Sequence, residues 1–153
     1  MKIIETKDIK LYENEAEFER AFAKLCEYEG LKYYKIPDVV PQRNKRTGQY
    51  YIPTARKRPF DGLLSTEFGL IALEFKYGNG QLKPHQWKVL QEITEKNGSA
   101  FVLRYKWTKR KGSVFTIEVV LDYGNLWVYS IYGELDALLS GVVELKQRGI
   151  DLF

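Results

Sequence analysis

The sequence predicts one α/β (α+β) domain that spans residues 1–153. This length is typical of a single domain with a buried core, and 44% of the residues are hydrophobic. Three segments show the periodicity of helices, and the segments between them show the two-residue alternation of strands. Together these observations favour a sheet that packs against helices.

The first helix is predicted over residues 14–29. Asn14 is a suitable N-cap, and Gly30 suits the position just after the last turn. Two acidic residues that suit the first turn follow the cap: Glu15 and Glu17. An apolar stripe runs along one face, with Glu19 beside it. A helix packed on a sheet would aim Glu19 at the sheet edge, and an ordinary exposed glutamate fits the helix taken alone equally well.

A β-hairpin is predicted over residues 59–76, with its turn at residues 67–69. The second strand alternates in character, so Glu74 and Lys76 point to the same face. Asp61 lies on the first strand at a position nearly opposite Glu74, within reach across the strand pair. The hairpin therefore brings two carboxylates to one point, with a lysine one pleat further on.

This combination suits metal-assisted hydrolysis of a phosphodiester. Carboxylate oxygens bind Mg²⁺ or Mn²⁺, which polarises a phosphoryl oxygen and lowers the pKa of a bound water. A neighbouring lysine can orient that water and offset the charge that develops on phosphorus. The structural alternative is an amphipathic hairpin with a salt bridge across its polar face, which a chain with 29% charged residues can form by chance.

The segment 37–58 is rich in proline, tyrosine and basic residues, and Tyr50 and Tyr51 lie within a short predicted strand. Lysine and arginine interleaved with aromatic residues suit contacts with a nucleic-acid backbone, and a solvated loop is the alternative. A second basic loop is predicted over residues 106–111. The candidate DNA-binding residues of the first segment are Arg43, Lys45, Arg46, Arg56, Lys57 and Arg58.

The remaining elements follow from the same patterns. A helix begins near Pro84 and ends before Gly98, and Gln86 in its first turn lies close to the end of the strand that carries Lys76. Gln86 is a candidate contact to a phosphate or to a metal-bound water, with an exposed glutamine as the alternative. Further strands are predicted over 31–36 and 99–105, a hairpin over 113–131 and a helix over 134–148.

The order helix, three strands, helix, strand, with the motif Pro59-Phe60-Asp61 followed by Glu74-Phe75-Lys76, resembles the core of the PD-(D/E)xK nuclease superfamily. The pair Glu19-Arg20, with Gly30 at the end of its helix, is similar to the opening helix of archaeal-type Holliday junction resolvases. His85-Gln86 resembles the corresponding pair of bacterial and phage relatives.

This resemblance implies a restriction-endonuclease-like αβββαβ core, in which helices flank a central mixed sheet, with an added C-terminal hairpin and helix. It implies an acidic cluster of Glu19, Asp61 and Glu74, with the main-chain carbonyl of Phe75 as a further metal ligand. It also implies Lys76 as the residue that positions or deprotonates water, and Gln86 as an accessory catalytic residue. The expected cofactor is Mg²⁺, with Mn²⁺ as a substitute.

The resemblance further implies a structure-selective DNA endonuclease, first of all a homodimeric resolvase that cuts four-way junctions, since two symmetric cuts favour a two-fold dimer. Another nuclease of the superfamily, such as a nickase, a flap nuclease or a restriction or repair enzyme, is the alternative. A DNA-binding module without catalysis is a further one. The four residues Glu19, Asp61, Glu74 and Lys76 argue for catalysis.

Composition narrows the remaining classes of protein. The single cysteine, Cys26, excludes an intrachain disulfide framework. A single cysteine and a single histidine, His85, also argue against a zinc site. We expect a cytoplasmic protein without a membrane partner, since no apolar run has the length of a signal peptide core or a membrane span. The net charge of +4 and the isoelectric point near 9.0 are compatible with a nucleic-acid partner.

Overall fold

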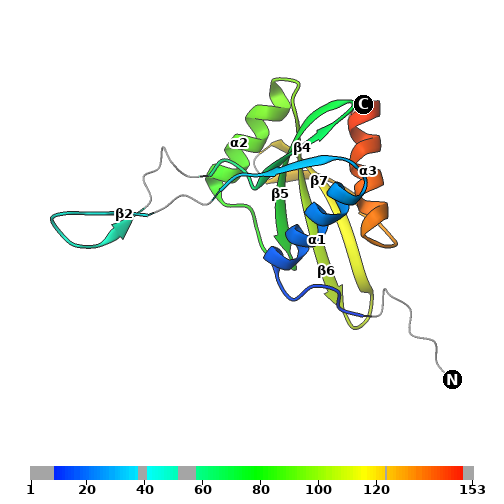
Figure 1. Cartoon of the computed structure of the whole chain (residues 1–153), viewed down its shortest axis with the longest axis horizontal. Helices are drawn as coiled ribbons and strands as arrows, with labels where there is room; N and C mark the ends of the chain where they lie inside the picture. Colours follow the sequence, from blue (N-terminus) through cyan, green and yellow to red (C-terminus); the bar gives the residue numbers. More distant parts are fainter. Residues whose placement is uncertain (1–8, 38–40, 52–57, 123, 150–153) are drawn as a thin grey trace.

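The structure is a computed structural model that describes residues 9–37, 41–51, 58–122 and 124–149. These residues form three helices and eight strands (Figure 1). In chain order the elements are α1 (Glu15–Tyr28), β1 (Lys32–Lys35), β2 (Gln42–Arg43), β3 (Tyr50–Tyr51), β4 (Gly62–Thr66), β5 (Gly69–Tyr77), α2 (Pro84–Glu95), β6 (Ser99–Thr108), β7 (Gly112–Asp122), β8 (Asn125–Ile131) and α3 (Leu135–Arg148).

Six strands form one mixed sheet in the order β1-β4-β5-β6-β7-β8. The β5–β6 pair is parallel, and α2 makes the crossover between these two strands. The other pairs of this sheet are antiparallel. The predicted α+β class, with a central mixed sheet and three helices, is confirmed.

The sheet separates two apolar cores. On one face α1 and α3 cover an aromatic cluster, and Figure 1 shows these two helices side by side. On the other face α2 packs through Leu90 against Ala100 and Val102 of β6. The aromatic cluster, which fixes α1 against β5, β6 and β7, includes Phe18, Phe22, Phe75, Tyr105 and Phe115.

The predicted caps set the ends of α1. The side chain of Asn14 accepts a hydrogen bond from the Glu17 N–H at 2.9 Å, and Gly30 follows the last turn with a φ of 78°. A positive φ of this size is favourable for glycine because it has no Cβ. The acidic first turn therefore lies at a fixed point relative to the sheet.

The β4–β5 hairpin has the predicted register. Thr66 pairs with Gly69 across the turn, and Gly62 pairs with Leu73 near the other end. Asp61 immediately precedes β4, and its N–H donates to the Leu73 carbonyl at 3.0 Å. The next position along β5 is Glu74, so Asp61 lies at the end of the paired region beside that residue.

Two expectations for the basic segments need correction. Residues 106–111 are not a loop throughout, because β6 continues to Thr108 and β7 begins at Gly112. The alternation that buries Tyr105 extends past the predicted end of the strand, so Lys106 belongs to β6. Within residues 37–58, β3 has a partner strand that the sequence analysis did not predict: Tyr51 of β3 pairs with Gln42 of β2.

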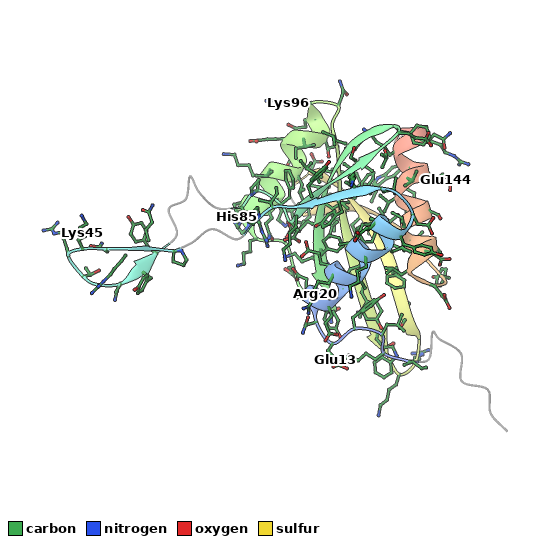
Figure 2. The ribbon with its side chains drawn as sticks, in the orientation of Figure 1. Glu13, Arg20, Lys45, His85, Lys96 and Glu144 are labelled. Carbon is green, nitrogen blue, oxygen red and sulfur yellow. The ribbon has the colours of Figure 1, made fainter. Side chains whose placement is uncertain are left out.

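The β2–β3 hairpin, called the basic hairpin below, stands apart from the six-stranded sheet (Figure 1). Figure 2 shows Lys45 at its outer end, far from His85 at the start of α2. No helix among the described residues is long and apolar enough to cross a membrane.

Candidate metal centre

Asp61 is fixed by hydrogen bonds to both oxygens of its carboxylate. The Phe75 N–H donates to Oδ2 at 2.6 Å, and Nη2 of Arg58 donates to Oδ1 at 2.7 Å. Only 1% of Asp61 is exposed, so these partners offset part of the cost of burying its charge.

Glu74, Lys76 and Gln86 form a short chain of contacts on the face of the sheet that α2 covers. Gln86 Nε2 donates to Glu74 Oε1 at 3.0 Å, and Lys76 Nζ donates to Gln86 Oε1 at 3.2 Å. The same Gln86 oxygen accepts a hydrogen bond from the Lys83 N–H at 2.8 Å. The start of α2 therefore holds Gln86 between the carboxylate and the amine, in agreement with its predicted place beside Lys76.

A third carboxylate comes from the first turn of α1. Oxygens of Glu15, Asp61 and Glu74 all lie within 4.8 Å of one another. We call these three residues the carboxylate cluster. Three converging carboxylates supply the hard oxygen ligands that Mg²⁺ and Mn²⁺ prefer, so the donor set fits such a cation. The coarser prediction of a possible metal site is confirmed, and the identity of the metal stays a prediction.

Proximity and burial change the acidity of this cluster. The pKa of Glu74 is raised from 4.5 to about 8, first because burial disfavours the charged carboxylate and second because Asp61 repels it. Lys76 acts in the opposite direction. Burial also raises the pKa of Glu15, and Asp61 adds to this effect. Glu74 and Glu15 thus bind protons more tightly than isolated carboxyls, as expected where carboxylates converge on a candidate cation site.

Glu19 lies one turn after Glu15. It was predicted to belong to the acidic cluster, but the structure places Glu15 there instead. Its Oε2 accepts a hydrogen bond from the Tyr33 hydroxyl at 2.7 Å, and its Oε1 lies 3.7 Å from Lys35 Nζ. Gly62 makes room for this arrangement, since a Cβ there would collide with the Tyr33 ring and hydroxyl. In this structure Glu19 therefore belongs to a neighbouring polar contact between α1 and β1.

Glu15 is the residue that the sequence analysis missed. It stands four positions before Glu19, so the two side chains share one face of α1. When α1 packs on the sheet and directs either Glu15 or Glu19 towards the β4–β5 hairpin, the other glutamate lies nearby. The signal was present as an acid in the first turn, but the depth at which α1 meets the sheet decides which of the two reaches Asp61.

The main chain of Phe75 lies beside the cluster. Its N–H is directed at Asp61, and the N–H and C=O of one residue point to the same edge of a strand. The Phe75 carbonyl is thus on the edge of β5 that Asp61 occupies, compatible with its predicted place near a metal. Its side chain is fully buried in the aromatic cluster, which anchors this part of β5.

The predicted DNA-binding residues fall into three groups. Arg43, Lys45 and Arg46 are exposed on the basic hairpin. Arg58 instead turns towards the carboxylate cluster, where it bonds to Asp61 and to the Ile36 carbonyl at 3.3 Å. Two of the predicted residues lie outside the described part of the chain: Arg56 and Lys57.

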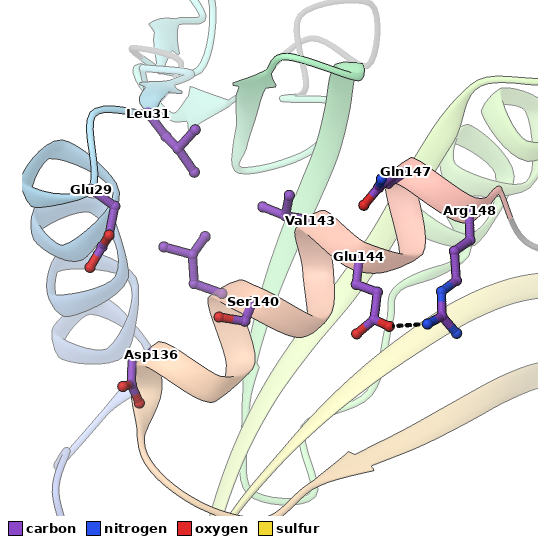
Figure 3. Close-up of a pocket in the computed structure, with 9 residues that line it drawn as sticks. Glu29, Leu31, Asp136, Ser140, Val143, Glu144, Gln147 and Arg148 are labelled. Atoms are coloured by element: carbon purple, nitrogen blue, oxygen red, sulfur yellow. Dashed lines mark ion pairs between the residues drawn. The ribbon is translucent and has the colours of Figure 1, made fainter.

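A large cavity lies elsewhere, between the end of α1 and α3 (Figure 3). It has a volume of about 860 Å³ and an apolar floor that includes Leu31 and Val143, with the ion pair Glu144–Arg148 at its rim. None of the carboxylate cluster lines it. We place the candidate site at the carboxylate cluster because size alone supplies no chemistry.

Comparison with known proteins adds no assignment: no protein-family model matches the chain, and no curated protein matches it.

The raised pKa of Glu74 predicts a specific pH dependence of stability. Between about pH 4.5 and 8 the folded protein keeps a proton that the unfolded chain has lost, so the free energy of unfolding falls as pH rises through this window. In EDTA, Tm measured by circular dichroism should therefore fall towards pH 8, and Glu74→Gln should flatten this fall. Because a cation replaces the proton, Mn²⁺ should raise Tm more at about pH 8 than at pH 6. Equal Mn²⁺ shifts at the two pH values would contradict this account.

Proposed function

We propose that this protein is a metal-dependent DNA endonuclease of the PD-(D/E)xK type. The observation that carries the proposal is the convergence of Glu15, Asp61 and Glu74 within 4.8 Å beside the buried amine of Lys76. A divalent cation bound by these oxygens would supply Lewis-acid stabilisation of the phosphoryl group and a water of lowered pKa.

The residues of the chain have separable roles in this proposal. Asp61, Glu74 and Glu15 hold the cation, and Phe75 orients Asp61 through its N–H. Lys76 is 8% exposed, and its amine is directed by Gln86 at 3.2 Å. From this position Lys76 orients the attacking water, accepts or shares its proton, and offsets negative charge on the transferring phosphoryl group.

The order of elements supports the family proposal. Apart from the basic hairpin, the chain runs α1, β1, β4, β5, α2, β6. Asp61 immediately precedes β4 and lies beside Glu74 of β5. This order is compatible with the αβββαβ arrangement that the sequence resemblance implies. Fold does not fix the substrate, so the choice of DNA rests on the basic residues and on the resemblance to resolvases.

A digestion panel with Mg²⁺ tests the function directly. Matched four-way junction, flap, linear duplex and single-stranded DNA should show cleavage of at least one substrate, with the junction preferred. Symmetric cuts in the junction and a homodimer in light scattering would support the resolvase. A monomer that cleaves without preferring the junction would leave an endonuclease of another specificity. Binding without any cleavage would replace the nuclease by a DNA-binding module.

The basic hairpin should contribute to affinity more than to chemistry. Simultaneous replacement of Arg43, Lys45 and Arg46 by alanine should weaken DNA binding and reduce its salt dependence, by roughly one unit of log–log slope per lost phosphate contact. Fluorescence anisotropy at several salt concentrations measures both quantities. The matched control replaces by alanine three exposed lysines elsewhere in the chain: Lys24, Lys32 and Lys96. Equal slopes for the two triple variants would show that the hairpin is only solvated surface.

A further inference from the structure

A second concave site lies at the far end of the β6–β7 hairpin, on the same face of the sheet as α2. It has a volume of about 340 Å³. We call it the hairpin pocket. The residues that line it are Arg104, Lys106, Thr108, Arg110, Lys111, Gly112, Val114 and Thr116. Four of these are cations, and none is acidic.

The geometry of β6 explains why this pocket is open. Residues 102, 104, 106 and 108 share one face of the strand. Helix α2 covers that face at Ala100 and Val102, which are buried against Leu90. The later residues of β6 extend past this contact, and Lys106 is exposed. Arg110 and Lys111 are also exposed, so the aliphatic stems of these three cations can line the pocket while their charged ends stay in contact with solvent.

Arg104 fixes the floor of the hairpin pocket. Its Nε donates to Glu118 Oε2 at 2.8 Å, and its Nη1 donates to the carbonyls of Gly78 at 2.9 Å and Gly80 at 2.6 Å. Glu118 is 4% exposed and balances this guanidinium. The charges of Lys106, Arg110 and Lys111 have no acidic neighbour among the lining residues, so the pocket as a whole attracts anions.

The same contacts join the hairpin pocket to the candidate metal centre. Lys76 of β5 and Arg104 of β6 are direct partners in the parallel register, so their side chains lie on one face. The loop that follows Lys76 contains Gly78 and Gly80, which Arg104 holds. It also contains Asn79, whose Oδ1 accepts a hydrogen bond from Lys106 Nζ at 2.7 Å. The pocket thus borders the loop that leads directly out of the strand carrying the lysine.

We propose that the hairpin pocket binds a backbone phosphate of the same DNA strand that the carboxylate cluster engages, with the adjoining sugar against the aliphatic stems. This inference rests on the proposed function. It specifies which part of the DNA the pocket contacts: the backbone of the cleaved strand, beyond the scissile phosphate. Phosphate contacts of this kind set the register of the strand without reading its sequence.

The test uses the full chain with Asp61→Asn, so that binding is measured without cleavage. Replacing Lys106, Arg110 and Lys111 by alanine should reduce the log–log salt slope by about one unit and the affinity by about tenfold at 0.1 M salt, because one phosphate contact is lost. The Lys24, Lys32 and Lys96 triple variant carries the same loss of charge and serves as the control. The Mn²⁺-induced rise in Tm of the pocket variant, measured without Asp61→Asn, should equal that of the wild type.

Position is tested with DNA that carries a single neutral methylphosphonate linkage. Scanned along the strand, one linkage near the scissile phosphate should weaken binding to the otherwise intact pocket and have no further effect on the pocket variant. If the loss of affinity from the neutral linkage and the loss from the pocket substitutions add fully at every position, the proposal is overturned. So would a pocket variant that binds like the control.

The two proposals fail separately. If the wild-type protein cleaves DNA and the pocket variant binds like the control, the phosphate site is wrong and the endonuclease stands. If nothing is cleaved but the pocket variant alone loses binding, the endonuclease is wrong and the phosphate site stands. Absence of both cleavage and DNA binding would overturn both.

Discussion

Replacing Asp61 by asparagine, or Glu74 by glutamine, should abolish metal-dependent DNA cleavage. Both substitutions keep the shape of the side chain and remove a negative oxygen from the carboxylate cluster. Loss of an outer-shell partner of a metal site typically costs roughly 10–100-fold, so loss of a direct ligand should cost on the order of 100-fold or more. Single-turnover cleavage at saturating enzyme measures this loss without a contribution from affinity.

The control for these two variants is DNA binding, which should be nearly unchanged because the basic hairpin and the hairpin pocket are intact. Glu19→Gln provides a matched substitution just outside the cluster, and it should retain most of the activity. Substantial Mg²⁺-dependent cleavage by either cluster variant would contradict the assignment of the metal centre.

Replacing Lys76 by methionine should lower the cleavage rate by roughly 10²–10⁴-fold, the range typical of a positioned proton-transfer group. Methionine keeps the apolar stem in its buried place and removes the amine, which limits the damage to packing. The affinity for Mn²⁺ should change much less than the rate, because Lys76 is not among the proposed ligands.

A second substitution at this position separates the two roles of the amine. Lys76→Arg keeps the positive charge but does not accept a proton near neutral pH. Recovery of most of the activity by arginine would assign Lys76 to charge stabilisation, and no recovery would assign it to proton transfer or to water orientation. If methionine leaves the rate unchanged, Lys76 is only a structural partner of Gln86 and has no catalytic role.

The sequence was sufficient to predict the β4–β5 hairpin and its two carboxylates. Strand register is determined by the turn and by a strict two-residue period, so the position of Asp61 relative to Glu74 follows from local information. Gln86 was placed for a similar reason, because it lies in the first turn of the helix that follows the strand. Its contacts with both Glu74 and Lys76 required the structure.

The third carboxylate was not predictable in the same way. Glu15 and Glu19 differ by one helical turn, and the packing of Phe18 and Phe22 against Phe75 decides which of them reaches the cluster. That packing depends on contacts between residues far apart in the sequence. The resemblance to resolvases favoured Glu19, whereas in the structure Glu19 accepts a hydrogen bond from the Tyr33 hydroxyl.

The same distinction applies to the basic segments. Composition identified the clusters of lysine and arginine, but charge has no periodicity that would reveal a strand. The continuation of β6 to Thr108 and the pairing of β2 with β3 follow from cross-strand hydrogen bonds. The hairpin pocket arises from the pairing of β6 with β7, which brings Lys106 and Val114 to opposite positions.

Direct counting of bound Mn²⁺ by electron paramagnetic resonance tests the central claim, that Glu15, Asp61 and Glu74 form one cation site. The wild-type protein should bind Mn²⁺ at this site, Asp61→Asn should abolish the binding and Glu15→Gln should weaken it. Glu19→Gln should leave it unchanged. Binding that is lost with Glu19→Gln and retained with Glu15→Gln, or that survives Asp61→Asn, would contradict the site.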